Sequence, residues 1–124
     1  TSIPDNAHIS EFLPGDQAAE KAALMICNGG SLSTYQAIQG GTPVLGIVGN
    51  LDQHLNMDYL TSSGIGESLR SEHATVVRVR KLIVKMLTET RYEEASQQAR
   101  LNAQKYNVKV SLPELIQNAQ RARN

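Results

Sequence analysis

The 124-residue chain contains one cysteine, Cys27, and one phenylalanine, Phe12. A single thiol cannot form an internal disulfide, and nothing in the cysteine content indicates an oxidising compartment, so we expect a cytoplasmic protein. The three histidines are scattered without the spacing of zinc ligands, which gives no reason to expect a metal site. No apolar run is long enough to span a bilayer, so no transmembrane segment is predicted.

The chain also has no excess of charge of either sign, with twelve basic and twelve acidic side chains. Bulk charge therefore predicts neither a nucleic-acid partner nor an acidic membrane. The two common nucleotide-binding loops, G-x-x-x-x-G-K-[ST] and G-x-G-x-x-G, are absent. A length of 124 residues suits one compact domain, and we treat residues 1–124 as a single domain.

What is present is an alternation of apolar runs and glycine-rich turns between residues 24 and 56. An apolar run at 24–27 leads into Asn28-Gly29-Gly30, helical spacing at 31–39, a second apolar run at 44–48 and a polar turn that reaches Asp52-Gln53. Strand, turn, helix, strand and turn is the order expected for a parallel α/β sheet. Such sheets bind ligands just beyond the carboxyl ends of their strands, where both polar turns fall.

The first turn has the chemistry of an anion site. Gly29 and Gly30 lack a Cβ, so the backbone can turn sharply and approach a ligand closely. Ser31 and Ser33 lie where the helix begins, and the free N–H groups of a helix start favour phosphate. The alternative is a plain glycine turn without a ligand, since short glycine motifs match by chance.

The second turn offers a carboxylate and an amide. Asp52 and Gln53 can together accept from and donate to vicinal hydroxyls. Because adjacent parallel strands end at the same edge, the two turns can face one cleft, and diphosphate plus hydroxyls describes a nucleotide sugar. The alternative for Asp52 is a helix N-cap, a role that is compatible with one oxygen contacting a ligand.

This ordered set resembles the donor-binding motif of the GT-B glycosyltransferases, in the branch of the UDP-glycosyltransferases and the macrolide and glycolipid transferases (glycosyltransferase family 28 C-terminal-like). The family motif runs through His-Gly-Gly, small residues with Thr, Glu-Ala-Leu, Gly-Val-Pro, a strand, Asp-Gln and Asn. The resemblance spans residues 3–69 and extends weakly over the helices that follow. The matching residues are Asn28-Gly29-Gly30, Ser33, Gln36-Ala37-Ile38, Gly41-Thr42-Pro43, Asp52-Gln53 and Asn56.

The resemblance implies roles for individual side chains. Phe12 would flank the nucleobase, with core packing as its alternative, and Gln36 would bind the ribose hydroxyls. Three residues depart from the motif. The Pro that follows the family's apolar strand is Val48, and the family's His and Glu are Asn28 and Gln36. Asn28 can donate a hydrogen bond but carries no charge, and Gln36 loses the strength of a charge-assisted bond. These last two changes weaken the expected donor affinity without removing the cleft.

The resemblance thus implies a Rossmann-like parallel sheet with flanking helices, the C-terminal half of a GT-B nucleotide-sugar-binding domain, ending in helices. The implied activity is transfer of a hexosyl group from a nucleoside diphosphate, UDP in this branch, to an acceptor hydroxyl, without a separate cofactor. The family's N-terminal acceptor domain and catalytic base have no counterpart in these residues, so we expect no catalytic residue here and no activity from this chain alone. A non-catalytic module with a degenerate donor site and a nucleotide-sugar epimerase of the same fold stay open.

Hydrophobic spacing predicts the remaining elements. We expect strands at 8–13 and 67–69, a short helix at 17–23 capped by Asp16, and a helix at 52–62. The run at 24–27 is expected to be a buried strand.

The last third of the chain is predicted to be helical throughout. Apolar residues recur at helical spacing in three stretches, and we expect each stripe to pack in the core. These stretches run from Val76 to Leu87, from Tyr92 to Tyr106 and from Leu112 to Ala119.

Overall fold

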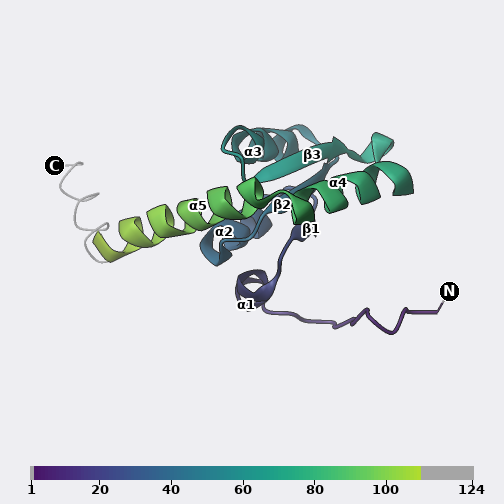
Figure 1. Ribbon diagram of the computed structural model, residues 1–124, viewed down its shortest axis with the longest axis horizontal. Coiled ribbons are helices and arrows are strands. Elements are labelled where there is room, and N and C mark those ends of the chain that lie inside the picture. The colour runs from purple at the N-terminus through teal and green to yellow at the C-terminus, as the bar shows by residue number, and fades with distance from the viewer. Residues whose placement is uncertain (1, 110–124) are drawn as a thin grey trace.

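The computed structural model describes residues 2–109 and shows a three-stranded parallel sheet flanked by helices (Figure 1). The strands β1 (Met25–Cys27), β2 (Val44–Val48) and β3 (Gly66–Arg70) lie in the order β1-β2-β3. In this register Val44 lies beside both Met25 and Gly66. The predicted parallel α/β architecture is confirmed, including β3 as a short edge strand.

Helices fill the connections between the strands and the segment after them. Those after β1 and β2 begin at the carboxyl edge of the sheet, as expected for strand–helix–strand units. The predicted helix from Leu112 to Ala119 lies outside the described residues. The helices are α1 (Gly15–Lys21), α2 (Ser31–Gly40), α3 (Leu51–Ser62), the 3₁₀ turn η1 (Ser71–His73), α4 (Val76–Thr88) and α5 (Thr90–Lys109).

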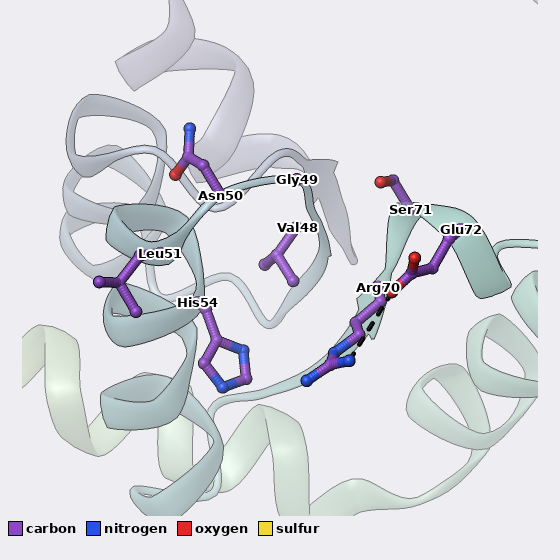
Figure 2. A pocket seen from close by; sticks show the side chains of 8 residues that line it. All are labelled: Val48, Gly49, Asn50, Leu51, His54, Arg70, Ser71 and Glu72. Carbon is purple, nitrogen blue, oxygen red and sulfur yellow. Dashed lines mark ion pairs between the residues drawn. The ribbon is translucent and has the colours of Figure 1, made fainter.

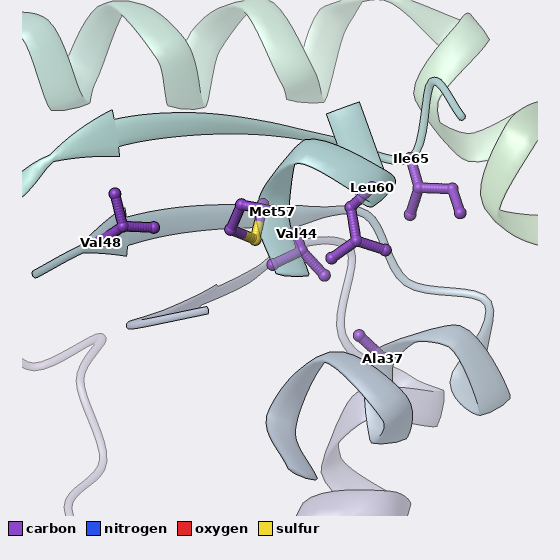
Figure 3. Close-up of a cluster of buried hydrophobic side chains, with 6 residues drawn as sticks. All are labelled: Ala37, Val44, Val48, Met57, Leu60 and Ile65. Carbon is purple, nitrogen blue, oxygen red and sulfur yellow. The ribbon is translucent and has the colours of Figure 1, made fainter. Parts of the chain in front are cut away.

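One face of the sheet packs against α2 and α3. Side chains alternate along a strand, so Val44 and Val48 point to this face, where they meet Met57 and Leu60 of α3 (Figure 3). Ala37 of α2 completes the contact and is fully buried. This cluster fixes the starts of α2 and α3 relative to the strand ends, which is where the polar turns lie.

Gly46 explains how closely α3 approaches the sheet. A Cβ at this position would lie 2.5 Å from both Cγ and Sδ of Met57, so only glycine allows the thioether to lie directly on β2. The same methionine also approaches Gly29 in the turn after β1, where a Cβ would lie 2.8 Å from its Cγ. Met57 therefore links the packing of the core to the geometry of the first turn.

The opposite face of the sheet packs against α4 and the start of α5 through Leu45, Met86 and Tyr92. Tyr92 is fully buried, and its hydroxyl donates to Glu67 of β3, which also pairs with Lys85 at 3.3 Å. Burial raises the pKa of the Tyr92 phenol, with the hydrogen bond to Glu67 acting in the same direction. These polar contacts attach both helices to β3 and lie apart from the carboxyl-edge turns.

Two sequence predictions about the N-terminal region are wrong. Residues 8–13 are not a strand: they make no sheet pairing with any described residue, and Phe12 is 82% exposed. An extended segment without a neighbouring strand has no ladder of hydrogen bonds to stabilise it. Core packing of Phe12 is excluded by the same exposure. Asp16 does not cap α1 either, because the helix begins at Gly15 with Pro14 as its N-cap residue.

The predicted burial was also wrong at two places. β1 is not a buried strand, since Ile26 is 48% exposed. Within residues 2–109, β1 has a neighbour on one side only, which leaves its other edge open. The apolar stripe of α4 packs only in part, because Met86 is buried but Val76 and Leu87 at the helix ends are largely exposed.

Candidate functional site

Two polar turns lie together at the carboxyl edge of the sheet. The first, Asn28–Gly30, joins β1 to α2. The second joins β2 to α3 at Gly49–Asn50 and is taken here to include Asp52 and Gln53, which lie in the first turn of α3. Asn56, on the second turn of α3, connects them, because its side-chain Nδ2 donates to the Gly29 carbonyl at 3.1 Å and to the Ser31 hydroxyl at 3.4 Å. This contact places the first turn beside α3, and the cleft that the sequence predicted between the two turns stays a prediction.

The first turn is built around Gly29. Its φ of +84° lies in the region that residues with a Cβ rarely adopt. The Gly29 N–H donates to the Cys27 thiol at 3.4 Å, and the Gly30 N–H donates to Asn28 Oδ1 at 2.9 Å, an Asx turn. Both glycine N–H groups are thus used within the turn, and the expectation that they are free to bind an anion fails for this conformation.

The free backbone N–H donors belong to the residues that follow the glycines, in the first turn of α2. Gly30 is the N-cap residue and no side chain caps the helix. Among residues 2–109, no group accepts from the N–H groups of Ser31, Leu32 or Ser33. These groups and the positive end of the helix dipole point out of the sheet edge, where an anion can bind. Asn28 is exposed, and its Nδ2 remains available as a further donor.

The Cys27 side chain contacts the first turn by accepting the hydrogen bond from the Gly29 N–H. Burial raises the pKa of its thiol above the ordinary value, an effect that the hydrogen bond from Gly29 only partly opposes. The side chain is therefore a neutral thiol at physiological pH rather than a reactive thiolate. Its position indicates a packing role, as its place after an apolar run suggested.

The second turn is closed by its own side chains. Asn50 Oδ1 accepts from the Gln53 N–H at 2.9 Å and caps α3, while Gln53 Oε1 accepts from the Gly49 N–H at 2.7 Å. The alternative role of Asp52 as the helix cap is therefore wrong. Asp52 is exposed in the first turn of α3, and no described residue donates to its carboxylate. Its oxygens and the Gln53 amide N–H₂ remain free for a ligand.

Gln36 lies on a different side of α2 from Asn56. It is half-buried against Gly15 at the start of α1, so close that a Cβ there would overlap its side-chain amide. Phe12 lies three residues before Gly15, in the exposed segment that leads into α1. Gln36 therefore faces the start of α1, and Phe12 lies in the segment that precedes this helix. Neither residue belongs to the turn that carries Asp52 and Gln53.

A hollow lies between the carboxyl ends of β2 and β3, and Gly49 and Asn50 of the second turn form part of its lining (Figure 2). His54 and Arg70 line it from α3 and β3, with Glu72 paired to Arg70 at 3.7 Å. Sequence analysis missed Arg70, although its place at the end of β3 follows the same rule that identified the other turns. His54 also pairs with Asp58 at 3.7 Å on this side, away from Asn56.

In the described part of the chain, no group of three or more His, Cys, Asp or Glu side chains is arranged to hold a metal ion. No helix within residues 2–109 combines the length and apolar character needed to cross a membrane.

A parallel sheet with polar turns on its carboxyl edge is the arrangement in which open α/β proteins bind nucleotides and related ligands. Residues 1–113 match the family described as "Erythromycin biosynthesis protein CIII-like, C-terminal domain", and the chain belongs to this family. The resemblance to glycosyltransferases seen in the sequence is thereby confirmed.

Named relatives carry glycosyltransferase activities. The PGL/p-HBAD biosynthesis rhamnosyltransferase of Mycobacterium bovis (strain BCG / Pasteur 1173P2) is 40% identical over 120 residues, which cover 97% of this chain and 26% of that protein. The PGL/p-HBAD biosynthesis glycosyltransferase of Mycobacterium tuberculosis (strain ATCC 25177 / H37Ra) is 39% identical over 95 residues, 77% of this chain and 22% of that protein. The chain thus spans about a quarter of the length of these relatives.

Solved structures agree on the fold. Spinosyn forosaminyltransferase SpnP matches with a TM-score of 0.80 at 22% identity, over 85% of this chain and 28% of that chain. Spinosyn rhamnosyltransferase SpnG complexed with thymidine diphosphate matches with a TM-score of 0.74 at 26% identity, over 81% of this chain and 28% of that chain. The architecture is that of the C-terminal domain of GT-B glycosyltransferases.

Proposed function

We propose that this chain is the donor-binding part of a glycosyltransferase that moves a sugar from a nucleoside diphosphate to an acceptor hydroxyl. The observation that carries the proposal is the contact from Asn56 to Gly29 and Ser31, since it joins an open helix start to a turn bearing a free carboxylate. One half suits a diphosphate and the other suits sugar hydroxyls. The family and the named relatives make transfer the favoured reaction for such a pair.

In this proposal the diphosphate lies at the start of α2. The N–H groups of residues 31–33 and the helix dipole stabilise its charge, and Asn28 adds a neutral donor. The negative charge on the diphosphate grows as the sugar–oxygen bond breaks, so the same donors stabilise the leaving group. No side-chain cation is needed for this, which is why Asn28 can stand where the family motif has His.

The sugar lies toward the start of α3. Asp52 accepts from its hydroxyls and the Gln53 amide donates to them, because Gln53 Oε1 is already bonded to Gly49. On the other side of α2, Gln36 binds the ribose and the exposed ring of Phe12 flanks the base. The segment bearing Phe12 packs against the nucleoside when the donor binds.

The donor is a pyrimidine nucleoside diphosphate sugar, with no separate cofactor. The sequence motif is that of UDP-sugar enzymes, whereas SpnG was solved in complex with thymidine diphosphate. Stacking on Phe12 does not distinguish uracil from thymine, because it does not depend on the 5-methyl group. Parallel titrations with UDP, dUDP and dTDP separate the effect of the base from that of the 2′-hydroxyl.

The acceptor and the general base that activates its hydroxyl are proposed to come from a second domain of the whole protein, N-terminal to this part. We therefore expect the isolated 124 residues to transfer no sugar. The test is a transfer assay on the purified chain and on the full-length protein, using the same nucleotide sugar and a panel of hydroxylated acceptors. Turnover by the isolated chain would contradict the assignment of the general base and the acceptor site to a second domain.

The donor-binding proposal itself is tested by calorimetry on the full-length protein. We expect saturable binding of UDP or dTDP, and release of nucleoside diphosphate only when an acceptor is present. Absence of nucleoside diphosphate binding would refute the proposal and favour a degenerate, non-catalytic module. Conversion of the nucleotide sugar to an isomer without any acceptor would favour the epimerase.

A further inference from the structure

Asn56 lies outside the groups assigned above to the diphosphate and the sugar, yet it makes the contact that joins them. We propose that Asn56 is a positioning residue: by donating to the Gly29 carbonyl, it holds the Asn28–Gly30 turn in the conformation that presents the free N–H groups of α2 to a diphosphate. The inference rests on the proposed donor site and adds a residue on which its geometry depends.

The geometry of the peptide bond between Gly29 and Gly30 explains how one hydrogen bond can do this. The bond is planar and trans, so its C=O and N–H point in opposite directions. Asn56 fixes the carbonyl on the α3 side at 3.1 Å, and the Gly30 N–H is thereby turned toward Asn28 at 2.9 Å. Holding the carbonyl sets the direction of the N–H.

The turn needs such an external restraint because two adjacent glycines lack the steric limits that hold other residues. The Gly29–Gly30 peptide rotates about the ψ of Gly29 and the φ of Gly30, and residues without a Cβ restrict both angles only weakly. Rotation of this peptide would move the Gly29 carbonyl toward the anion position, where it would repel phosphate. Asn56 prevents this by giving the carbonyl a partner on the protein side.

The second contact of Asn56 extends the restraint to the start of α2. Its Nδ2 also approaches the Ser31 hydroxyl at 3.4 Å, so a Ser31 oxygen lone pair faces α3. The Ser31 O–H is then directed away from α3 and can donate to the diphosphate. Asn56 is half-buried and lies 27 residues from Gly29 in the sequence, so it acts across the fold rather than within the turn.

The test compares Asn56→Ala and Asn56→Asp in the full-length protein, with UDP, dTDP and their sugars as calorimetric ligands. Loss of one net hydrogen bond predicts roughly threefold to tenfold weaker binding for Asn56→Ala, equal for the nucleoside diphosphate and the nucleotide sugar. Asn56→Asp should bind more weakly still, because a carboxylate cannot donate to the carbonyl and repels phosphate. Asn102→Asp adds the same charge to an exposed position on α5 and should bind like the wild type.

The pH dependence separates positioning from a general loss of structure. The affinity of the Asn56→Asp variant, divided by that of the wild type at the same pH, should rise as the pH falls from about 7.5 to about 5. The reason is that a protonated carboxyl regains a donor for the Gly29 carbonyl, and partial burial raises the pKa of the introduced carboxyl above about 3.9. The corresponding ratio for Asn56→Ala should not depend on pH.

Nucleoside diphosphate affinity within about twofold of wild type in both variants would overturn the proposal, since even half of a typical net hydrogen bond changes affinity by more than this. So would failure of both variants to fold, judged by circular dichroism, because Asn56 would then be a structural residue. If only Asn56→Asp fails to fold, the affinity of Asn56→Ala decides. A wild-type protein that binds no nucleoside diphosphate would instead refute the proposed function, which keeps the two failures distinct.

Discussion

The two turns at the carboxyl edge of the sheet each lead into a helix, and they differ in how the start of that helix is stabilised. The second turn is closed locally: Asn50 caps α3, and Gln53 satisfies the N–H of Gly49. The first turn leaves α2 without a side-chain cap and depends on Asn56, from another helix, to hold its backbone. A helix start without a side-chain cap has free backbone N–H groups that a ligand can use. A capped helix start offers a ligand mainly its side chains.

This difference assigns a separate task to each turn. The open turn offers backbone donors, which suit the negative charge of a diphosphate. The closed turn offers the Asp52 carboxylate and the Gln53 amide, which suit hydroxyls. The predictions below test whether the two turns differ in the way that this comparison requires.

The largest expected effect is that of Gly29→Ala. A residue with a Cβ at a φ of +84° costs about 1–3 kcal/mol, and this Cβ would also lie 2.8 Å from Met57 Cγ. The matched change in the closed turn is Gly49→Ala, where the nearest atom is Gln53 Oε1 at 3.6 Å, an ordinary contact. Chemical denaturation of the full-length variants should show the loss for Gly29→Ala and a change within about 0.5 kcal/mol for Gly49→Ala.

Similar stabilities of these two glycine variants would contradict the claim that only the first turn requires glycine. A nucleoside diphosphate titration on the same samples sharpens the comparison. Gly29→Ala should weaken this binding, because its backbone orients the start of α2, and Gly49→Ala should not.

A smaller effect is expected for Asn50→Ala, which removes the cap of α3. Loss of an N-cap side chain typically costs about 1 kcal/mol, and here it also frees the Gln53 N–H. Thermal unfolding of the full-length protein should show a lower midpoint, with nucleoside diphosphate affinity nearly unchanged. An unchanged midpoint would mean that the second turn is not held by its own cap.

The smallest expected change in stability is that of Gly30→Ser, which supplies the cap that α2 lacks. Serine is better than glycine at an N-cap by only a few tenths of a kcal/mol, and its Cβ would lie a tight 3.1 Å from Asn28 Oδ1, so stability should change by less than about 0.5 kcal/mol. Its hydroxyl would accept from an N–H that the proposed site keeps free, so nucleoside diphosphate binding should fall. If calorimetry shows tighter or equal binding, the free N–H groups of α2 are not the diphosphate donors.

The sequence predicted the parallel fold and most element boundaries because alternating apolar runs and glycine turns are local signals. β2 was predicted at its observed bounds, and both turns were placed at the correct strand ends. The strand at 8–13 was wrong because pairing requires a neighbour, and none of the described residues provides one. Hydrophobic periodicity indicates which secondary structure a segment can form. Whether a strand forms depends on a neighbouring strand with which it can pair.

The details of the site were less predictable, for a physical reason. Asp and Asn near a helix start can both serve as N-caps, and the sequence alone could not show that Asn50, rather than Asp52, takes this role. The hydrogen bond of Gly30 to Asn28 and the bridge from Asn56 depend on side-chain orientation. Arg70 was missed because it lies at the end of an edge strand, without a glycine turn to mark it.

The central claim is that one turn binds the diphosphate and the other the sugar, and Asp52→Ala tests it most directly. Calorimetry on the full-length variant should show nucleotide-sugar affinity reduced about tenfold to a hundredfold, since charge-assisted bonds contribute about 1.5–3 kcal/mol each. Affinity for the bare nucleoside diphosphate should stay unchanged, as should stability, because Asn50 caps the helix. Equal losses for the two ligands, or a loss of stability alone, would contradict the claim.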